Sequence, residues 1–195
     1  VGCNPFSLGD EFFEKVSECK VNRLSIGLQS ANDGERRILG RRAGKSEVQS
    51  VVSRAKKAGI NNISLDVMLG VPGQTKESLK STLDFCISSG VPHLSCYILK
   101  IEENTPFFRM RDKLPFPSDD DTAVMYLFMC AYLEEHGIMQ YEISNFAVPG
   151  FESRHNLKYW HDEEYLGIGA SAHSFLGGKR TYYPRDIEYF ISGNE

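Results

Sequence analysis

The chain has 195 residues, of which 41% are hydrophobic and 25% are charged, and its formal net charge is −4. Such a composition is typical of a globular protein with one domain, or with one domain and part of a second. The scattered basic residues argue against a nucleic-acid surface, and no apolar run reaches the roughly 20 residues of a membrane span. The first residues do not resemble a signal peptide, so we expect a cytoplasmic protein without an integral membrane segment.

The five cysteines are too far apart in the sequence to form a CxxC motif. Their odd number and wide spacing predict neither a set of disulfide bonds nor a metal site. We therefore expect them to behave as small buried residues. They are Cys3, Cys19, Cys86, Cys96 and Cys130.

Three short segments share one pattern, in which an apolar residue precedes two mostly polar residues, an aliphatic residue, a serine and a further apolar residue. They span residues 21–27, 60–66 and 91–97. A pattern that recurs at such intervals indicates a repeated supersecondary unit. Each segment has the length of a strand and continues into a helical pattern.

Helical patterns lie on either side of these strands. The first helix is expected to start at Ser7 or Asp10 and the second at Ser46, whereas the third has Thr75 as its N-cap. Gly59 is expected to end the second helix. The predicted buried faces are Phe12, Phe13 and Val16; Val48, Val51, Val52 and Ala55; and Leu79, Leu83 and Cys86, respectively.

The order of these elements indicates the fold class. Strands that alternate with helices pair in parallel through right-handed crossovers. An open doubly wound sheet and a barrel both have this order. All three strands end in polar or glycine residues, which favours an α/β fold with part of a (β/α) TIM-type barrel, its parallel strands surrounded by outer helices. In either fold, ligands bind at the carboxyl ends of the strands.

The character of the sequence changes after Pro117. Ser118 and the acidic run at 119–121 predict the start of a helix, because acidic residues suit the positive end of the helix dipole. This helix is expected to end at Gly137 and to be followed by a strand at 138–143. Its predicted apolar positions are Val124, Leu127, Phe128, Ala131 and Leu133.

These patterns divide the chain after residue 117. Residues 1–117 are predicted to form a partial barrel. Residues 118–195 are predicted to form the last barrel unit or units and the start of a family-specific, loop-rich C-terminal region, with a late helix at 186–191. An eight-unit barrel needs about 200–250 residues, and the first residues resemble the end of a strand, so we expect a fragment of a longer protein.

Polar side chains at the strand ends are the first candidates for a binding site. Gln29 closes the first strand, and its amide offers a donor and an acceptor for a ribose or an amino-acid group; otherwise it bonds local backbone in a turn. Asp66 closes the second strand, where an acid is costly to bury without a partner. That partner is a ligand, or it is Arg41 or a backbone amide in a structural brace. Arg41 itself suits a ligand carboxylate, or it is simply solvated.

Histidines in the last third of the chain are further candidates. His155 lies beside Tyr159 and Trp160, and a histidine among aromatic residues suits an axial haem ligand; otherwise its ring bonds the backbone. The small residues at 167–174, which include His173, allow a ligand to approach the backbone. They match a dinucleotide-binding fingerprint only weakly, because the third glycine is missing.

Together these segments resemble a known family, with matching pieces in family order between Cys3 and Tyr189. The pieces are Asn4-Pro5, residues 22–30, 62–66, 70–75 and 93–102, Thr105-Pro106, residues 141–147, His155-Asn156 with Tyr159-Trp160, and residues 165–174. The family is the radical S-adenosylmethionine (SAM) group that contains oxygen-independent coproporphyrinogen III oxidase and its haem-chaperone relatives. Each piece is short, but the ordered set is highly specific.

The resemblance implies a partial barrel that uses SAM and a [4Fe–4S] cluster held by a CxxxCxxC loop. At matching positions, it implies SAM contacts at Gln29, Arg41 and Asp66. It also implies SAM contacts near Lys100 and at the pair Ala172-His173, through the backbone.

Two departures from the family pattern concern the cofactors. The CxxxCxxC loop does not occur in this sequence, so the fragment is predicted to bind no cluster, to have no metal site and to be inactive by itself. Gly2 stands where the family has a glutamate that contacts SAM, which puts that contact in doubt.

The pattern at 155–160 resembles the haem-chaperone branch. This branch implies haem binding at His155 and delivery of haem to haem-accepting proteins. The alternative is the oxidase itself, which acts on a porphyrinogen and decarboxylates two propionates to vinyl groups. A further alternative is an unrelated βα enzyme or binding module that uses Asp66 and Glu142 as acid–base groups.

Overall fold

The computed structural model describes residues 1–193. The chain forms two compact units, and the boundary between them lies between Glu152 and Ser153. The first unit therefore includes the helix and the strands that follow Pro117. The prediction that a family-specific region begins after residue 117 stays a prediction.

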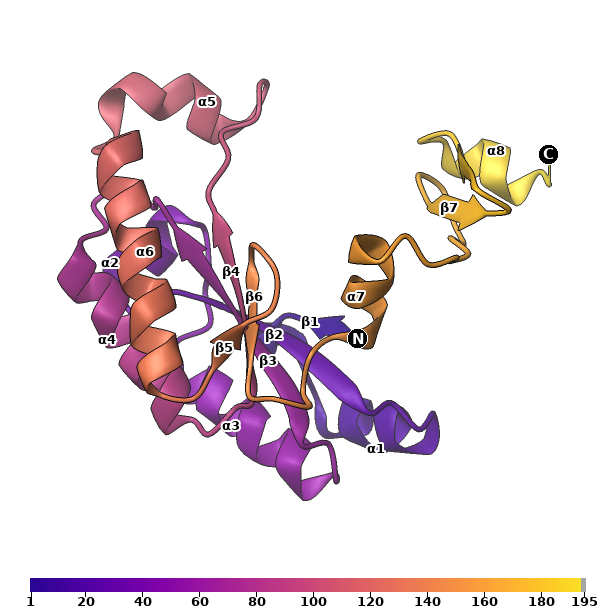
Figure 1. The fold of residues 1–195 in the computed structure, drawn as a ribbon, viewed down its shortest axis with the longest axis horizontal. Coiled ribbons are helices and arrows are strands. Elements are labelled where there is room, and N and C mark those ends of the chain that lie inside the picture. The colour runs from indigo at the N-terminus through magenta and orange to yellow at the C-terminus, as the bar shows by residue number, and fades with distance from the viewer. Residues whose placement is uncertain (194–195) are drawn as a thin grey trace. The chain divides into compact units, whose positions relative to one another are not determined.

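The first unit contains a six-stranded sheet (Figure 1). Its first four strands are parallel and follow the order of the chain, as predicted. The last two are antiparallel additions, because β6 runs antiparallel to both β4 and β5. In spatial order the strands are β1 (Gly2–Cys3), β2 (Arg23–Gln29), β3 (Asn62–Leu69), β4 (His93–Ile98), β6 (Asn145–Ala147) and β5 (Met139–Gln140).

Six α-helices and two short 3-10 helices belong to this unit. The helices expected before and between the strands are present, and the long helix after residue 117 is present as well. The α-helices are α1 (Asp10–Glu18), α2 (Asp33–Ile38), α3 (Lys45–Lys57), α4 (Lys76–Ser88), α5 (Pro106–Met110) and α6 (Asp119–Glu135). The 3-10 helices are η1 (Pro5–Ser7) and η2 (Arg111–Lys113).

Two of the predicted helix caps are confirmed and one is wrong. The Thr75 and Ser118 side chains accept hydrogen bonds from backbone N–H groups in the first turns of α4 and α6. Ser46, however, lies inside α3. The N-cap is Gly44, whose N–H donates to the Glu47 carboxylate at 2.8 Å. The Glu47 carboxylate thus satisfies the N–H of the cap residue, whereas the predicted Ser46 hydroxyl would have accepted from an N–H in the first turn.

One face of the sheet forms the hydrophobic core. Aliphatic residues of β2, β3 and β4 are fully buried there against α3, α4 and α6, which lie on the same side of the sheet (Figure 1). Each such side chain contributes about 1.5–3 kcal/mol by its burial. The apolar residues that α3 and α4 bury are the predicted ones, and α4 also buries Thr82. The strand residues are Leu24, Ile26, Leu28, Ile63, Leu65, Val67, Leu69, Leu94 and Cys96.

The predicted apolar face of α6 is wrong in most positions. Val124 is 58% exposed and Leu127 is 67% exposed, whereas Met125, Met129 and Leu133 are buried against the sheet. Apolar residues occur all around this helix, so hydrophobic periodicity does not select a face. Packing against the sheet selects it instead.

The opposite face of the sheet is polar. Register places Ser25 beside Ser64 and Ser64 beside His93, and it places Gly27 beside Asp66 and Asp66 beside Ser95. Because residues in register point to the same side, these side chains form two polar rows across three strands. This face carries the candidate site.

The second unit is described by itself. It contains α7 (Arg154–Trp160), the antiparallel hairpin of β7 (His173–Leu176) and β8 (Lys179–Tyr182), and α8 (Ile187–Ile191). The late helix is confirmed, with Asp186 as its N-cap. Within residues 1–193, none of the helices has the length and apolarity required to cross a membrane.

Candidate functional site

Gln29 ends β2 in an unusual backbone conformation. Its φ angle is 67°, in the left-handed region that residues other than glycine seldom adopt, and a register shift lies between Gly27 and Gln29. The residue is only 8% exposed. Its amide has no hydrogen-bond partner among residues 1–193. A strained strand end whose side-chain amide has no protein partner favours a role in binding over the role of a turn residue.

The position of this amide follows from its distance to Gly27. A Cβ atom built on Gly27 would lie 3.0 Å from Nε2 of Gln29. The side chain therefore folds back over β2 on the face to which residue 27 points. Gly27 is in register with Asp66, and neighbouring strands are about 4.8 Å apart. The Gln29 amide and the Asp66 carboxylate thus lie on the same face of the sheet, on adjacent strands.

Asp66 is held by hydroxyl groups. The Ser25 hydroxyl donates to Oδ1 of Asp66 at 2.8 Å. Burial raises the pKa of the Asp66 carboxyl above its ordinary value, and Ser25, the Arg23 charge, Ser95 and the Arg41 charge oppose this rise. No ion pair joins Asp66 to Arg41 within the described residues. A structural brace between these two side chains, which the sequence left open, is therefore not observed.

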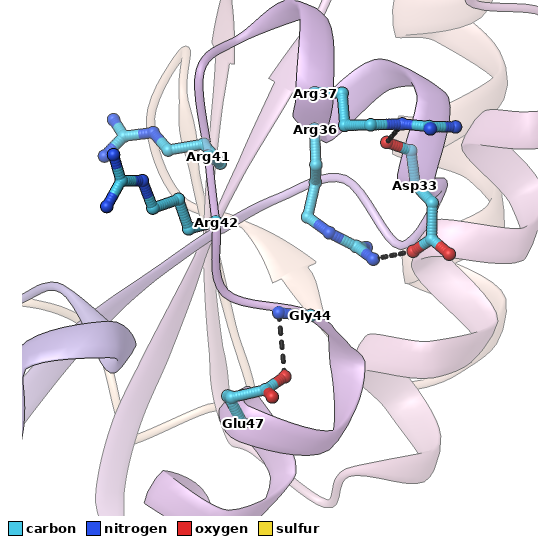
Figure 2. A pocket seen from close by; sticks show the side chains of 7 residues that line it. All are labelled: Asp33, Arg36, Arg37, Arg41, Arg42, Gly44 and Glu47. Carbon is cyan, nitrogen blue, oxygen red and sulfur yellow. Dashed lines mark hydrogen bonds and ion pairs between the residues drawn. The ribbon is translucent and has the colours of Figure 1, made fainter.

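Arg41 lies on the exposed segment between α2 and α3. It lines a cavity of about 380 Å³ together with three other arginines and two acidic residues (Figure 2). Arg36 is buried and paired with Asp33, whereas Arg41 and Arg42 extend to the other side of the segment (Figure 2). Neither Arg41 nor Arg42 has a carboxylate partner within residues 1–193, so both guanidinium groups are available to an anion.

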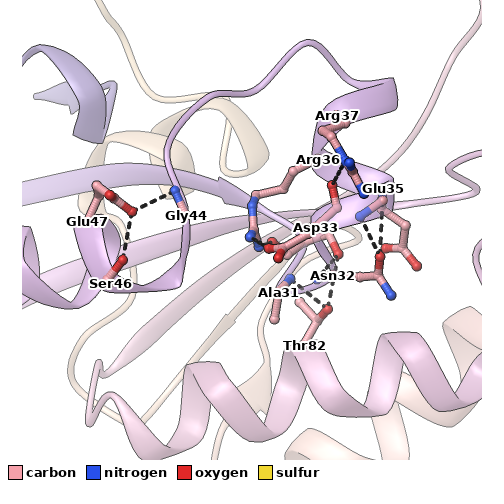
Figure 3. A network of polar contacts seen from close by, with 12 residues as sticks. Ala31, Asn32, Asp33, Glu35, Arg36, Arg37, Gly44, Ser46, Glu47 and Thr82 are labelled. Carbon is pink, nitrogen blue, oxygen red and sulfur yellow. Dashed lines mark hydrogen bonds and ion pairs between the residues drawn. The ribbon is translucent and has the colours of Figure 1, made fainter.

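Polar contacts fix the segment that follows Gln29 (Figure 3). The Thr82 hydroxyl on α4 accepts from the Ala31 N–H at 3.0 Å, and the Asn32 side chain caps α2 by accepting from the Gly34 N–H at 2.8 Å. These bonds join the end of β2 to α2 and α4. They hold the backbone near Gln29 and explain how its strained conformation is maintained.

A second clamp holds the loop after β3, and sequence reasoning missed it. The Gln74 amide accepts from the Gly70 N–H at 2.8 Å and donates to the Met68 carbonyl at 3.0 Å. It also contacts the buried Glu35 carboxylate at 3.4 Å, and the Ser78 hydroxyl donates to the same carboxylate at 2.5 Å. The motif at 70–75 is therefore a loop clamp next to Asp66.

Lys100 follows the end of β4. Its ammonium group is exposed and forms an ion pair with Glu102 at 2.8 Å. This contact strengthens the protonated form and raises the pKa of Lys100. Its predicted place near SAM stays a prediction.

His155 and His173 belong to the second unit. Nε2 of His155 lies 2.9 Å from the Tyr159 hydroxyl, and the two rings meet edge to face. The histidine thus bonds a side chain, not the backbone as the alternative prediction had it. The His173 ring stacks on Tyr182, while the Ala172 N–H donates to the Gly169 carbonyl at 3.1 Å. The SAM contacts predicted for Ala172 and His173 stay predictions.

The cysteines do not form a metal site in the described part of the chain. Within residues 1–193, no group of three or more histidine, cysteine or acidic side chains is arranged to hold a metal ion. All five cysteines are free thiols. Cys86 and Cys96 are buried, as predicted, and burial raises their pKa. Cys19 is exposed, so that prediction was wrong, and Cys3 and Cys130 are half-buried. These residues do not fit a [4Fe–4S] cluster.

Sequence comparison relates the chain to haem chaperones. The sequence profile of the radical SAM superfamily matches residues 1–86. The heme chaperone HemW of Bacillus subtilis is 40% identical over 98% of this chain and 51% of its own length. HemW of Escherichia coli is 37% identical over 97% of this chain and 51% of its own length. The chain therefore spans about half the length of these relatives.

Structural comparison confirms the predicted α/β partial barrel. The coproporphyrinogen III oxidase HemN from Escherichia coli, a radical SAM enzyme, superposes with a TM-score of 0.82 at 20% identity, over 96% of this chain and 46% of that chain. The parallel order of β1 to β4 and the polar inner face agree with this fold. By its sequence similarity to the radical SAM profile and to HemW, the chain belongs to the radical SAM superfamily, in the family that contains the heme chaperone HemW, and it shares its fold with the coproporphyrinogen III oxidase HemN.

Proposed function

We propose that the polar face at the carboxyl ends of β2 and β3 binds SAM. The unpaired Gln29 amide, on the same face of the sheet as the Asp66 carboxylate, carries this proposal. Two ribose hydroxyls can donate to a half-buried carboxylate, and an amide can accept from or donate to the same ligand. Arg41 is the cation for the carboxylate of SAM. Lys100 is proposed as a further contact, whereas the contact predicted for the pair Ala172-His173 stays a prediction.

Replacement of Asp66 by asparagine tests the SAM site. The variant keeps the shape of the side chain and removes its charge, and a hydrogen bond to a charged group contributes about 1.5–3 kcal/mol. We expect Asp66→Asn to weaken SAM binding roughly 10- to 100-fold in the protein expressed from its complete gene, as measured by titration calorimetry. Glu11→Gln on the surface of α1 is the control. Equal affinities of wild type and Asp66→Asn would refute the proposal.

We propose further that the whole protein binds haem and delivers it to haem-accepting proteins. The similarity to heme chaperones over nearly the whole chain and the cluster of His155, Tyr159 and Tyr165 support this proposal. We propose a [4Fe–4S] cluster only for the whole protein, where it would supply the electron for reductive cleavage of SAM, because the described residues of this chain would not hold it. Coproporphyrinogen III oxidation is the alternative activity, which an anaerobic assay on coproporphyrinogen III distinguishes.

We also propose a cytoplasmic location, because all five cysteines are free thiols.

Haem titration of two variants tests the role of His155. A ring nitrogen must offer its lone pair to the iron, so His155→Ala is expected to weaken haem binding about 10-fold or more and to shift the Soret band. Tyr159→Phe keeps the aromatic ring but removes the hydroxyl that contacts Nε2. This variant is expected to bind haem at least as tightly as wild type. Unchanged haem binding by His155→Ala would remove His155 from the site.

A further inference from the structure

We propose that Gly27 is a positioning residue of the ligand site, which acts by leaving room for the Gln29 amide beside Asp66. The inference rests on the proposed SAM site and deepens it. Gly27 touches no ligand in this account. Its role is the space that a side chain at position 27 would otherwise fill.

The first observation is the direction in which residue 27 points. Ser25 and Asp66 contact one another across the polar face, whereas Ile26 and Leu28 are buried on the helix-covered face. By strand alternation, a side chain at position 27 would point to the polar face, in the same row as Asp66 and Ser95. This row is the one that meets the proposed ligand.

The second observation is what occupies that space. The atom nearest to a Cβ atom built on Gly27 is Nε2 of Gln29, at 3.0 Å. No other atom outside its chain neighbours lies within 4 Å of that position. Gln29, whose amide occupies the space, is 8% exposed as a residue. The amide is also unpaired among residues 1–193, so its donors and its acceptor remain for a ligand.

The third observation is that the backbone does not require glycine here. Gly27 does not have a positive φ angle, unlike eleven other glycines in the described chain. Glycine inside a strand loses more conformational freedom on folding than alanine does. Alanine is therefore compatible with the backbone of β2 and favourable for stability. The space for the amide, and not the strand, accounts for glycine at this position.

It follows that Gly27→Ala moves the amide and leaves the fold intact. The close contact involves the far end of a flexible side chain, which can rotate away at little cost. At 3.0 Å the amide must shift by at least a few tenths of an ångström, and this displacement weakens the hydrogen bond from the amide to a ligand that also contacts Asp66.

A double-mutant cycle on SAM binding tests this inference. The variants are Gly27→Ala, Gln29→Ala and the double variant, in the protein expressed from its complete gene. One hydrogen bond corresponds to a loss of about 3- to 10-fold in affinity, which we expect for each single variant. The double variant should bind as weakly as Gln29→Ala alone, because no amide remains to be displaced. Melting temperatures of Gly27→Ala should equal or exceed that of wild type.

Nuclear magnetic resonance provides a readout that does not depend on SAM. The side-chain NH₂ signals of Gln29, assigned by their loss in Gln29→Ala, should shift in Gly27→Ala without ligand. Losses that add in the double variant, or unshifted Gln29 signals, would overturn the inference. If wild type binds no SAM but the Gln29 signals shift, the proposed SAM site fails while the positioning role of Gly27 stands.

Discussion

A single buried histidine connects three strands of the sheet. Nδ1 of His93, on β4, lies 2.8 Å from the Ser64 hydroxyl and 3.2 Å from the Arg23 guanidinium group. Its other nitrogen lies 2.8 Å from the Tyr141 hydroxyl. Burial, and then the Arg23 charge, lower the pKa of His93 to about 3. The ring is therefore neutral and serves as a polar bridge on the same face as Asp66.

Because the pKa of His93 is lowered in the folded state, we expect the stability of the protein to depend on pH. Between pH 6.5 and about 3 the unfolded chain binds a proton that folded His93 does not bind. The free energy of unfolding should therefore fall with decreasing pH in this window, by up to about 1.4 kcal/mol per pH unit. The raised pKa of Asp66 acts in the opposite direction just above pH 3.8, the ordinary value of its carboxyl.

Denaturant titrations at several pH values check this expectation. His93→Gln keeps a polar group at the position and removes the titration. The variant should be less stable at pH 7 but should lose less stability than wild type between pH 6.5 and 4. An equal slope in both proteins would show that His93 does not cause the dependence.

Among the site residues, those at strand ends were predictable and their partners were not. Gln29 and Asp66 follow strands in the sequence, and parallel strands bring their ends together. The contacts of His93 with Arg23 and Tyr141 join residues 70 and 48 positions apart. No local pattern encodes such pairs. The strained φ of Gln29 likewise depends on contacts with α4, which only the folded chain provides.

At the scale of elements, the loop after β3 depends on a buried side-chain clamp. Gln74 satisfies the Gly70 N–H and the Met68 carbonyl, and Glu35 joins it to α2. The loop begins where β3 ends, three residues after Asp66. The clamp thus restrains the strand end that carries the carboxylate.

Removal of the clamp should destabilise the first unit. Gln74→Ala leaves a buried N–H without its partner, which costs about 1–3 kcal/mol of unfolding free energy. Glu134→Ala, at an exposed position of α6, is the control and should change this free energy by less than about 0.5 kcal/mol. Equal effects of the two variants in urea titrations would contradict the clamp.

Elements with a clear period were predictable, and the others required packing. The three parallel strands and the helices α3 and α4 follow from alternation and helical spacing, because one face of each is distinctly apolar. The apolar residues of α6 surround the helix, so its buried face was misassigned. The predicted strand at 138–143 is reduced to Met139–Gln140, and β6 was missed. Strands of two or three residues carry too little pattern to be detected.

At the scale of the whole molecule, the first unit is a sheet with one apolar face and one polar face. Helices cover the apolar face, and the polar face presents Gln29 and Asp66 from adjacent strands. Burial of this polar face inside an apolar barrel would leave polar groups without hydrogen-bond partners. Each such group would reduce the stability of the fold. The chain spans about half the length of the heme chaperones that it matches. We propose that a ligand completes the hydrogen bonds of the polar face.

The most direct test of this account is a crystal structure of the protein, expressed from its complete gene, with SAM bound. The account predicts the ribose hydroxyls within about 3 Å of the Asp66 carboxylate and a hydrogen bond from SAM to the Gln29 amide. It also predicts that the SAM carboxylate lies on the side of Arg41. SAM bound elsewhere, with Gln29 and Asp66 in contact only with solvent or protein, would contradict the account.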